Sequence, residues 1–163
     1  MFKRILVPID GSSTSNRGLE KAIALAKDHS AQLCVFHVVD ELELAPGLEG
    51  TIYLPPSYVD SVMHALRQKG QKLLAKAETR ARQQQLTVET VLQKVRGRSV
   101  AELIVQQAKK WRADVIVLGT HGRRGLSRLL MGSDAEMVVR EAPVPVLLVH
   151  SPARSGNRAA GRR

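Results

Sequence analysis

Aromatic side chains make up only 3% of this chain, and cysteine occurs once, at Cys34. A single cysteine excludes an intramolecular disulfide framework and any cysteine-rich zinc or iron–sulfur site. So few aromatic rings argue against a surface that stacks the bases of single-stranded nucleic acid. The sequence also lacks an apolar run of the roughly 18 residues that a membrane span needs. Its first residues lack the pattern of a signal peptide. These absences predict a cytoplasmic protein.

Acidic residues are the scarcer of the two charge signs. The 163 residues include 25 Lys and Arg but only 15 Asp and Glu, which gives a net charge of +10. A basic protein attracts phosphate groups in general, although such charge also serves solubility alone. Residues 151–163 hold four arginines, no acid and no large apolar side chain. We therefore expect one domain over residues 1–150, followed by a basic, disordered tail over residues 151–163.

Short apolar runs alternate with segments of helical periodicity along the chain. The predicted strands are 3–9, 32–39, 86–95, 113–119 and 144–150, and the predicted helices are 14–28, 58–85, 99–111 and 133–141. The strands have few polar positions, which is typical of parallel strands covered by helices on both faces. The sequence thus predicts an α/β fold, a single doubly wound five-stranded parallel sheet with helices on both faces.

Several local signals refine this pattern. The pairs Ser99 with Glu102 and Ser133 with Glu136 both have the S-x-x-E spacing of a capping box, which marks a helix start. Gly70 is a weak point of the predicted 58–85 helix because glycine has poor helix propensity. His37 and Cys34 lie within an apolar run, and we expect both to be structural core residues.

Glycines recur after the fourth predicted strand, in the pattern Gly119-x2-Gly122-x9-Gly132-Ser133. Gly132 and Ser133 stand at a helix start, where free backbone N–H groups and the helix dipole favour an anion. The loop also holds Arg123 and Arg124, which supply positive charge. The pattern therefore indicates a phosphate-binding loop, facing Asp10 across the crevice if the first and fourth strands are neighbours. The alternatives are that Ser133 only caps its helix and that Asp10 is only a turn residue.

The segments KRILVPIDGS, FHVVD, ADVIVLGTHGRRGLSRLLMGS and APVPVLLV resemble the universal stress protein family, specifically its ATP-binding branch. The resemblance covers residues 2–150. It implies the strand order 3-2-1-4-5, an adenine nucleotide in the crevice between the first and fourth strands, and a homodimer joined partly through the last strand. It also implies a role in the stress response.

The resemblance further implies a set of nucleotide-binding positions. Pro8 and Asp10 would contact the adenosine end, Val38 the adenine ring, and Leu118 and Gly119 the ribose side. The phosphates would be surrounded by His121, Gly122, Arg123, Gly132, Ser133 and the amide of Asp134. Asp134 departs from the family pattern, in which this residue is often uncharged. A carboxylate there repels a triphosphate unless a metal intervenes or the side chain points away.

The cofactor implied is ATP or another adenine nucleotide, with or without Mg²⁺ or Mn²⁺, and no metal ligand is assigned. We expect a regulatory protein rather than an enzyme, with no catalytic residue and at most slow ATP hydrolysis. The alternative functions are a nucleotide-free dimeric scaffold and a basic nucleic-acid-associated protein. Steeply salt-dependent, sequence-independent DNA binding would identify the latter.

Overall fold

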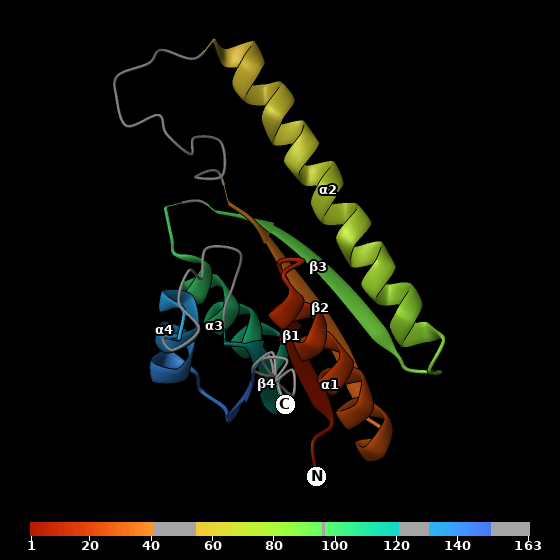
Figure 1. The fold of residues 1–163 in the computed structure, drawn as a ribbon. Coiled ribbons are helices and arrows are strands. Elements are labelled where there is room, and N and C mark those ends of the chain that lie inside the picture. Colours follow the sequence, from red (N-terminus) through yellow and green to blue (C-terminus); the bar gives the residue numbers. More distant parts are fainter. Residues whose placement is uncertain (41–54, 96, 121–130, 151–163) are drawn as a thin grey trace, which may run out of the picture.

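A computed structural model describes residues 1–40, 55–95, 97–120 and 131–150 of the chain. Strands and helices alternate along it (Figure 1). The strands are β1 Arg4–Pro8, β2 Gln32–Val39, β3 Val88–Lys94, β4 Val115–Gly119 and β5 Val146–Val149, and the helices are α1 Ser13–His29, α2 Pro56–Arg82, α3 Val100–Trp111 and α4 Ser133–Glu141. The predicted alternation is confirmed, and the ends of the elements differ from the predicted ones by up to three residues.

The strands form one parallel sheet with the order β3-β2-β1-β4-β5. The predicted doubly wound sheet is confirmed, with the strand order that the family resemblance implied, and this order places β1 beside β4 in the middle of the sheet. Each of the strands β1 to β4 is followed by a helix that returns the chain to the same end of the sheet. The carboxyl ends of all five strands therefore lie along one edge.

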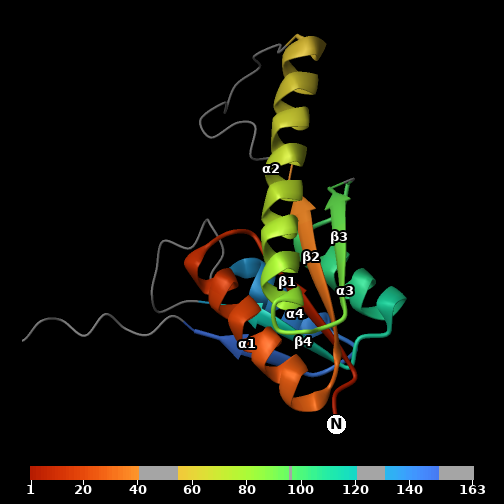
Figure 2. The same cartoon turned by 90° about the vertical axis from the view of Figure 1, so that its right-hand side faces the viewer.

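Two helices cover each face of the sheet. Helices α1 and α2 lie on one face, and α3 and α4 lie on the other (Figures 1 and 2). Alternate residues of the central strands supply the two cores. Ile5 and Val7 pack toward α1 and α2, whereas Leu6 and Phe36 pack toward α3 and α4. The central strands are buried on both sides, which explains why their sequences are almost continuously apolar.

Helix starts show which capping predictions hold. The Ser12 side chain caps α1 by accepting from the Ser15 amide, and Ser99 with Glu102 forms the predicted capping box at α3. The second predicted box, at Ser133, is wrong. Gly132 is the N-cap of α4 and Ser133 is already its first helical residue, so its hydroxyl does not reach the first-turn amides as a cap.

Helix α2 is 27 residues long and extends past the carboxyl ends of β2 and β3 (Figures 1 and 2). Its second half packs on the sheet through Leu74, Ala77 and Ala81. Gly70 is also buried, and a β-carbon at this position would lie 2.7 Å from Cδ2 of His37. Gly70 has poor helix propensity, but the close packing of α2 against β2 requires a glycine at this position.

Candidate functional site

The two halves of the sheet separate toward the carboxyl ends of β1 and β4. Pairing between these strands covers Ile5 with Val115 and Leu6 with Ile116, whereas pairing of β1 with β2 continues to Pro8 with Phe36. The sheet reverses its winding direction at this place, because β2 and β4 lie on opposite sides of β1. Ligands of doubly wound folds bind outside the strand ends at such a point. The sequence prediction that Asp10 and the Gly119 region flank this point is consistent with the strand order.

Asp10 follows β1 and organises the turn into α1. Its Oδ1 accepts a hydrogen bond from the Ser12 amide at 2.9 Å, and its own amide donates to Oγ of Ser15 at 3.3 Å. The turn also uses Gly11 at a φ of +83°, a backbone conformation that favours glycine. The turn role left open for Asp10 is therefore real. This turn holds the half-buried Asp10 side chain at the edge of the sheet where the strands end.

Gly119 ends β4 directly against the start of α1. A β-carbon at this position would lie 2.8 Å from the Thr14 carbonyl carbon and 3.0 Å from the Ser15 nitrogen. These are backbone atoms, which cannot turn away as a flexible side chain can. The first glycine of the motif is thus required by helix packing whether or not a ligand is bound.

Thr120 and Gly132 lie at the two ends of the segment 121–130, which is outside the described residues. The Thr120 amide donates to the Val149 carbonyl at 3.1 Å, and the Gly132 amide donates to the Thr120 carbonyl at 2.9 Å. These bonds hold the start of α4 next to the end of β4. The first-turn amides of α4 have no side-chain cap from Gly132, and Ser133 and Asp134 are exposed there. Such a helix start is suited to an anion.

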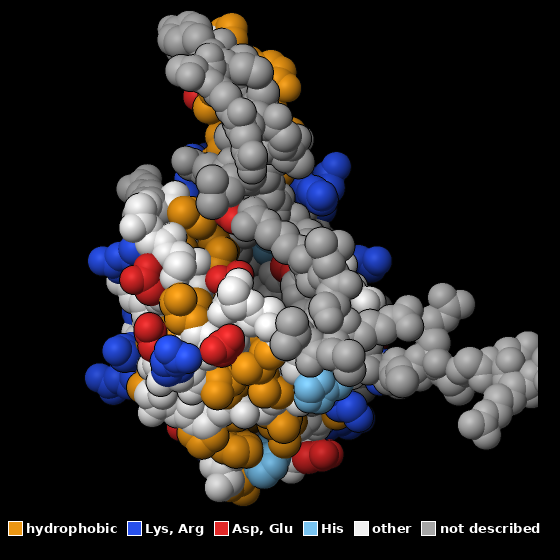
Figure 3. All heavy atoms as spheres, turned by 60° about the vertical axis from the view of Figure 1, so that its left-hand side comes forward, with side chains coloured by type: hydrophobic (Ala, Val, Ile, Leu, Met, Phe, Trp, Pro, Cys, Tyr) orange, Lys and Arg blue, Asp and Glu red, His pale blue; other side chains and the backbone are white. Residues whose placement is uncertain are grey.

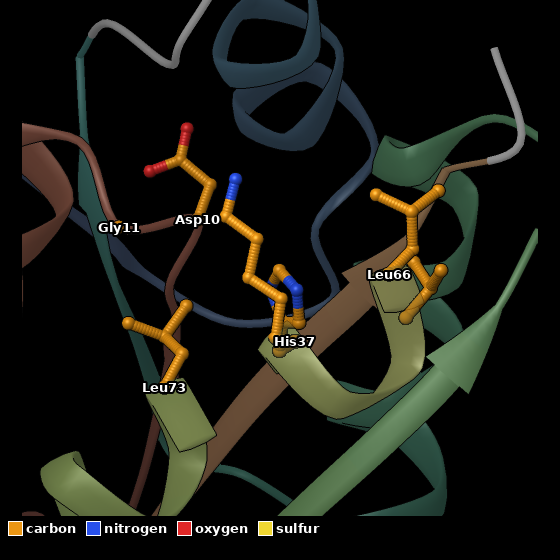
Figure 4. A pocket seen from close by; sticks show the side chains of 7 residues that line it. Asp10, Gly11, His37, Leu66 and Leu73 are labelled. Carbon is orange, nitrogen blue, oxygen red and sulfur yellow. The ribbon is translucent and has the colours of Figure 1, made fainter. Parts of the chain in front are cut away.

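A pocket of about 190 Å³ opens between α2 and the ends of β1 and β2. Figure 4 shows Leu66 and Leu73 projecting from α2 on either side of His37, with Asp10 at the end of β1. The described lining residues are Asp10, Gly11, His37, Val39, Leu66, Lys69 and Leu73. Aliphatic walls with a few polar groups are typical of sites for small organic ligands.

His37 is held rigidly in this pocket. The ring is buried, and Nδ1 lies 2.7 Å from the Ile9 carbonyl oxygen. Because a carbonyl only accepts, Nδ1 carries the proton and Nε2 has acceptor character in the neutral ring. The expectation of a structural histidine is confirmed, and the same side chain also lines the pocket.

The predicted site residues are distributed unevenly around this edge. Pro8 ends β1, Asp10 follows it two residues later, and Gly119 ends the neighbouring strand β4. The side chains of Val38 and Leu118 face the α3 and α4 side, where they belong to the core. His121, Gly122 and Arg123 lie outside the described residues.

Sequence reasoning missed the role of His37 and Val39 in the pocket, and it missed all of the α2 contributions. Leu66 and Leu73 carry the same helical apolar periodicity as core residues, and Lys69 has the sequence pattern of a solvated face. Only the docking of α2 over the ends of β1 and β2 makes them pocket residues. The sequence signal that could have pointed to this docking is Gly70, which requires a close tertiary neighbour.

The described part of the chain holds no group of three or more His, Cys, Asp or Glu side chains that could bind a metal ion. The single cysteine, Cys34, is buried in the sheet as predicted. None of the described helices is both long and apolar enough to cross a membrane.

The chain matches the model of the universal stress protein family over residues 1–150. It is 33% identical to universal stress protein YxiE of Bacillus subtilis, over 91% of this chain and 99% of that protein. It is 36% identical to universal stress protein MJ0531 of Methanocaldococcus jannaschii, over 93% of this chain and 84% of that protein. The chain therefore belongs to the universal stress protein family.

Solved structures share the fold. A universal stress protein from Burkholderia pseudomallei is 32% identical and superposes with a TM-score of 0.69, over 90% of this chain and 95% of that one.

Three more distant structures contain nucleotides. An Arabidopsis thaliana protein with AMP bound is 18% identical, with a TM-score of 0.65 and 93% of each chain covered. An Archaeoglobus fulgidus protein in complex with dAMP is 24% identical, with a TM-score of 0.59 over 90% and 97% of the two chains. A universal stress protein in complex with cAMP is 22% identical, with a TM-score of 0.64 over 93% and 99%. These likenesses establish the shared fold.

Proposed function

We propose that this universal stress protein binds an adenine nucleotide, with ATP as the leading candidate, and acts as a nucleotide-dependent regulator of the stress response. The observation that carries the proposal is the pocket between α2 and the ends of β1 and β2, which lies beside the reversal point of the sheet. The proposal is supported by family members of the same fold that were solved with AMP, dAMP and cAMP.

The purine ring fits the apolar part of the pocket. Leu66 and Leu73 of α2 and Val39 of β2 offer flat aliphatic contacts. Pro8, Asp10 and the backbone at Val38 lie at the same strand ends and would meet the adenosine. Leu118 and Gly119 would border the ribose.

The phosphates would lie at the start of α4, bound by the amides of Ser133 and Asp134. Gly132, His121, Gly122 and Arg123 complete the proposed phosphate site. Asp134 and Glu136 make the first turn of α4 acidic, which opposes a bare triphosphate. An accompanying Mg²⁺ or Mn²⁺ ion would relieve this repulsion in an ATP complex. We assign no catalytic residue and expect at most slow hydrolysis.

Isothermal titration with adenosine, AMP and ATP tests the two halves of the site separately. Leu66 is half-buried, so Leu66→Trp fills the pocket mouth at little cost to the core, and it should weaken all three ligands more than tenfold. The double change Gly132→Val with Ser133→Ala should weaken ATP and leave adenosine unchanged. Arg67→Ala, next to Leu66 on the exposed face, is the matched control. Equal ATP affinity in all of these variants would refute the proposal.

We also propose that residues 1–150 form the domain, that residues 151–163 form a basic tail, and that the protein works in the cytoplasm.

We further propose that the last strand joins a homodimer. β5 is an edge strand, and Leu147 on it is 43% exposed. Met137 and Val139 of nearby α4 are also exposed. Hydrophobic side chains gather on the face of the molecule that Figure 3 shows. Sedimentation should show a dimer that Leu147→Glu converts to a monomer.

A further inference from the structure

The positive charge of the described helices is concentrated in one layer of the fold. Helices α1 and α2 together carry nine Lys and Arg residues against four Asp and Glu. Helices α3 and α4 on the opposite face carry three against four. Helices α1 and α2 thus carry a net charge of +5 over 44 residues, and α3 and α4 a net charge of −1 over 21, so helix length alone does not explain the difference. It marks the α1–α2 face as a surface that attracts anions.

Within this layer, four basic residues form a line along α2. Lys69, Lys72, Lys76 and Arg80 follow one another at three- and four-residue spacing, which places them on one side of a helix. At 1.5 Å per residue the line spans about 16 Å. Lys69, Lys72 and Lys76 are exposed. We name these four residues the α2 basic line.

An ion pair neutralises Arg80 at one end of the α2 basic line, whereas Lys72 and Lys76 in its middle keep their charges available among the described residues. Arg80 lies 2.9 Å from the Glu20 carboxylate of α1. Lys72 and Lys76 form no ion pair with any residue of the described ranges 1–40, 55–95, 97–120 and 131–150. A surface selected only for solubility would intersperse both signs, as Arg82 and Glu78 do one turn apart on the same helix.

We propose that the α2 basic line binds the phosphate backbone of double-stranded nucleic acid without reading its sequence. A duplex carries about one charge per 1.7 Å of its axis, so a duplex segment as long as the line carries roughly ten phosphates on its two strands. Duplex rather than single strand follows from the side chains available. The described side chains of α1 and α2 include one large exposed hydrophobic, Tyr58, which stands about 16 Å along the helix from Lys69. Base stacking needs aromatic rings along the line, and a membrane surface needs apolar anchors beside it.

This binding is separate from the proposed nucleotide site, apart from Lys69, which belongs to both surfaces. Variants should therefore leave Lys69 intact. Lys72→Gln with Lys76→Gln removes two charges from the middle of the line. Lys109→Gln with Lys110→Gln removes two exposed charges from the last turn of α3, on the other face. The two double variants have the same net charge and the same tail, so any difference between them reports on position alone.

The experiment measures binding of the full chain to a short mixed-sequence DNA duplex between about 50 and 200 mM salt. Each phosphate contact contributes about 0.9 to the slope of log affinity against log salt, so losing two contacts should reduce that slope by about 1.8. The total loss of affinity between about 50 and 200 mM salt should then be about tenfold smaller than for the parent chain. We expect this change for the Lys72/Lys76 variant and none for the Lys109/Lys110 variant. Both should titrate adenine nucleotides like the parent chain, which distinguishes this proposal from the nucleotide site.

Three outcomes would overturn the proposal. Equal losses in both variants would mean that net charge governs binding, and unchanged binding in both would assign it to another part of the chain. The same two variants are also tested for binding to vesicles that contain phosphatidylserine. If the Lys72/Lys76 variant loses vesicle binding while its duplex binding is unchanged, the line is assigned to a membrane surface instead.

Discussion

Gly70 of α2 lies against the His37 ring of β2, so closely that a β-carbon on the glycine would stand 2.7 Å from His37 Cδ2 and 2.9 Å from Leu92 Cδ1. His37 cannot move away easily because its Nδ1 is bound to the Ile9 carbonyl. The contact fixes how close α2 approaches β2, and it therefore fixes the width of the pocket between them.

Gly70→Ala should destabilise the protein by about 1–2 kcal/mol, although alanine is the better helix former by about 1 kcal/mol. The steric conflict outweighs the propensity gain because the His37 ring is buried and held by its hydrogen bond to the Ile9 carbonyl. Urea denaturation measures the change, and Gln71→Ala at the next, exposed position should be neutral within about 0.5 kcal/mol. A Gly70→Ala protein as stable as the parent would show that α2 can shift outward freely.

Gly119→Ala should cost about 2–3 kcal/mol, because the new methyl group meets backbone atoms of Thr14 and Ser15. Gly97→Ala is an informative control. Gly97 has a φ of +64° with no atom within 4 Å of the added carbon, so only backbone strain of about 1–2 kcal/mol is expected there. Thermal unfolding of both variants separates close packing from conformational strain. Equal costs would remove the packing explanation.

Ser99→Ala and Ser133→Ala should differ although the two serines share the same S-x-x-E sequence context. Ser99 accepts from the Glu102 amide at 3.1 Å, so its loss should cost about 1 kcal/mol. Ser133 makes no corresponding cap, so its loss should leave the unfolding free energy unchanged within about 0.5 kcal/mol. Chemical denaturation tests both. A large effect at Ser133 would restore the capping role that the sequence suggested.

The Cys34 thiol should be inert in the folded protein. Burial, assisted by the nearby Glu89 carboxylate, raises the pKa of this thiol from 9.0 to about 12. Native protein at pH 8 should therefore resist thiol alkylation, which should go to completion in denaturant.

The same shift sets a pH dependence for stability. Between pH 9 and 12 the unfolded chain loses the Cys34 proton before the folded one does, so stability should fall as pH rises through this window. Cys34→Ala should lack this component of the decline. An identical pH profile in the two proteins would contradict the assignment.

Much of the fold could be predicted from local sequence. The apolar runs gave the strands, and the S-x-x-E pair at Ser99 gave the start of α3. The same reasoning failed at Ser133 because Gly132 takes the N-cap position one residue earlier. Short motifs do not specify which of two adjacent residues leaves the helical conformation.

The site was less predictable because its walls come from distant parts of the chain. Leu66 and Leu73 face His37 only once α2 docks on β2, and no local pattern distinguishes them from core leucines. The need for glycine at Gly119 likewise arises from α1, which lies far away in sequence. Glycine-rich loops can thus reflect tertiary packing as well as ligand approach.

The overhang of α2 has a consequence for the local opening of the chain. Among the described side chains of this helix, Met63 is the one buried residue before Gly70, whereas Leu74, Ala77 and Ala81 anchor the second half. Amide hydrogens before Leu66 should exchange with solvent through fraying that leaves the sheet intact, and those after Leu73 only through larger unfolding. The boundary between the two regimes falls at the pocket wall. A ligand bound there would extend the protected region toward the N-terminal end of the helix.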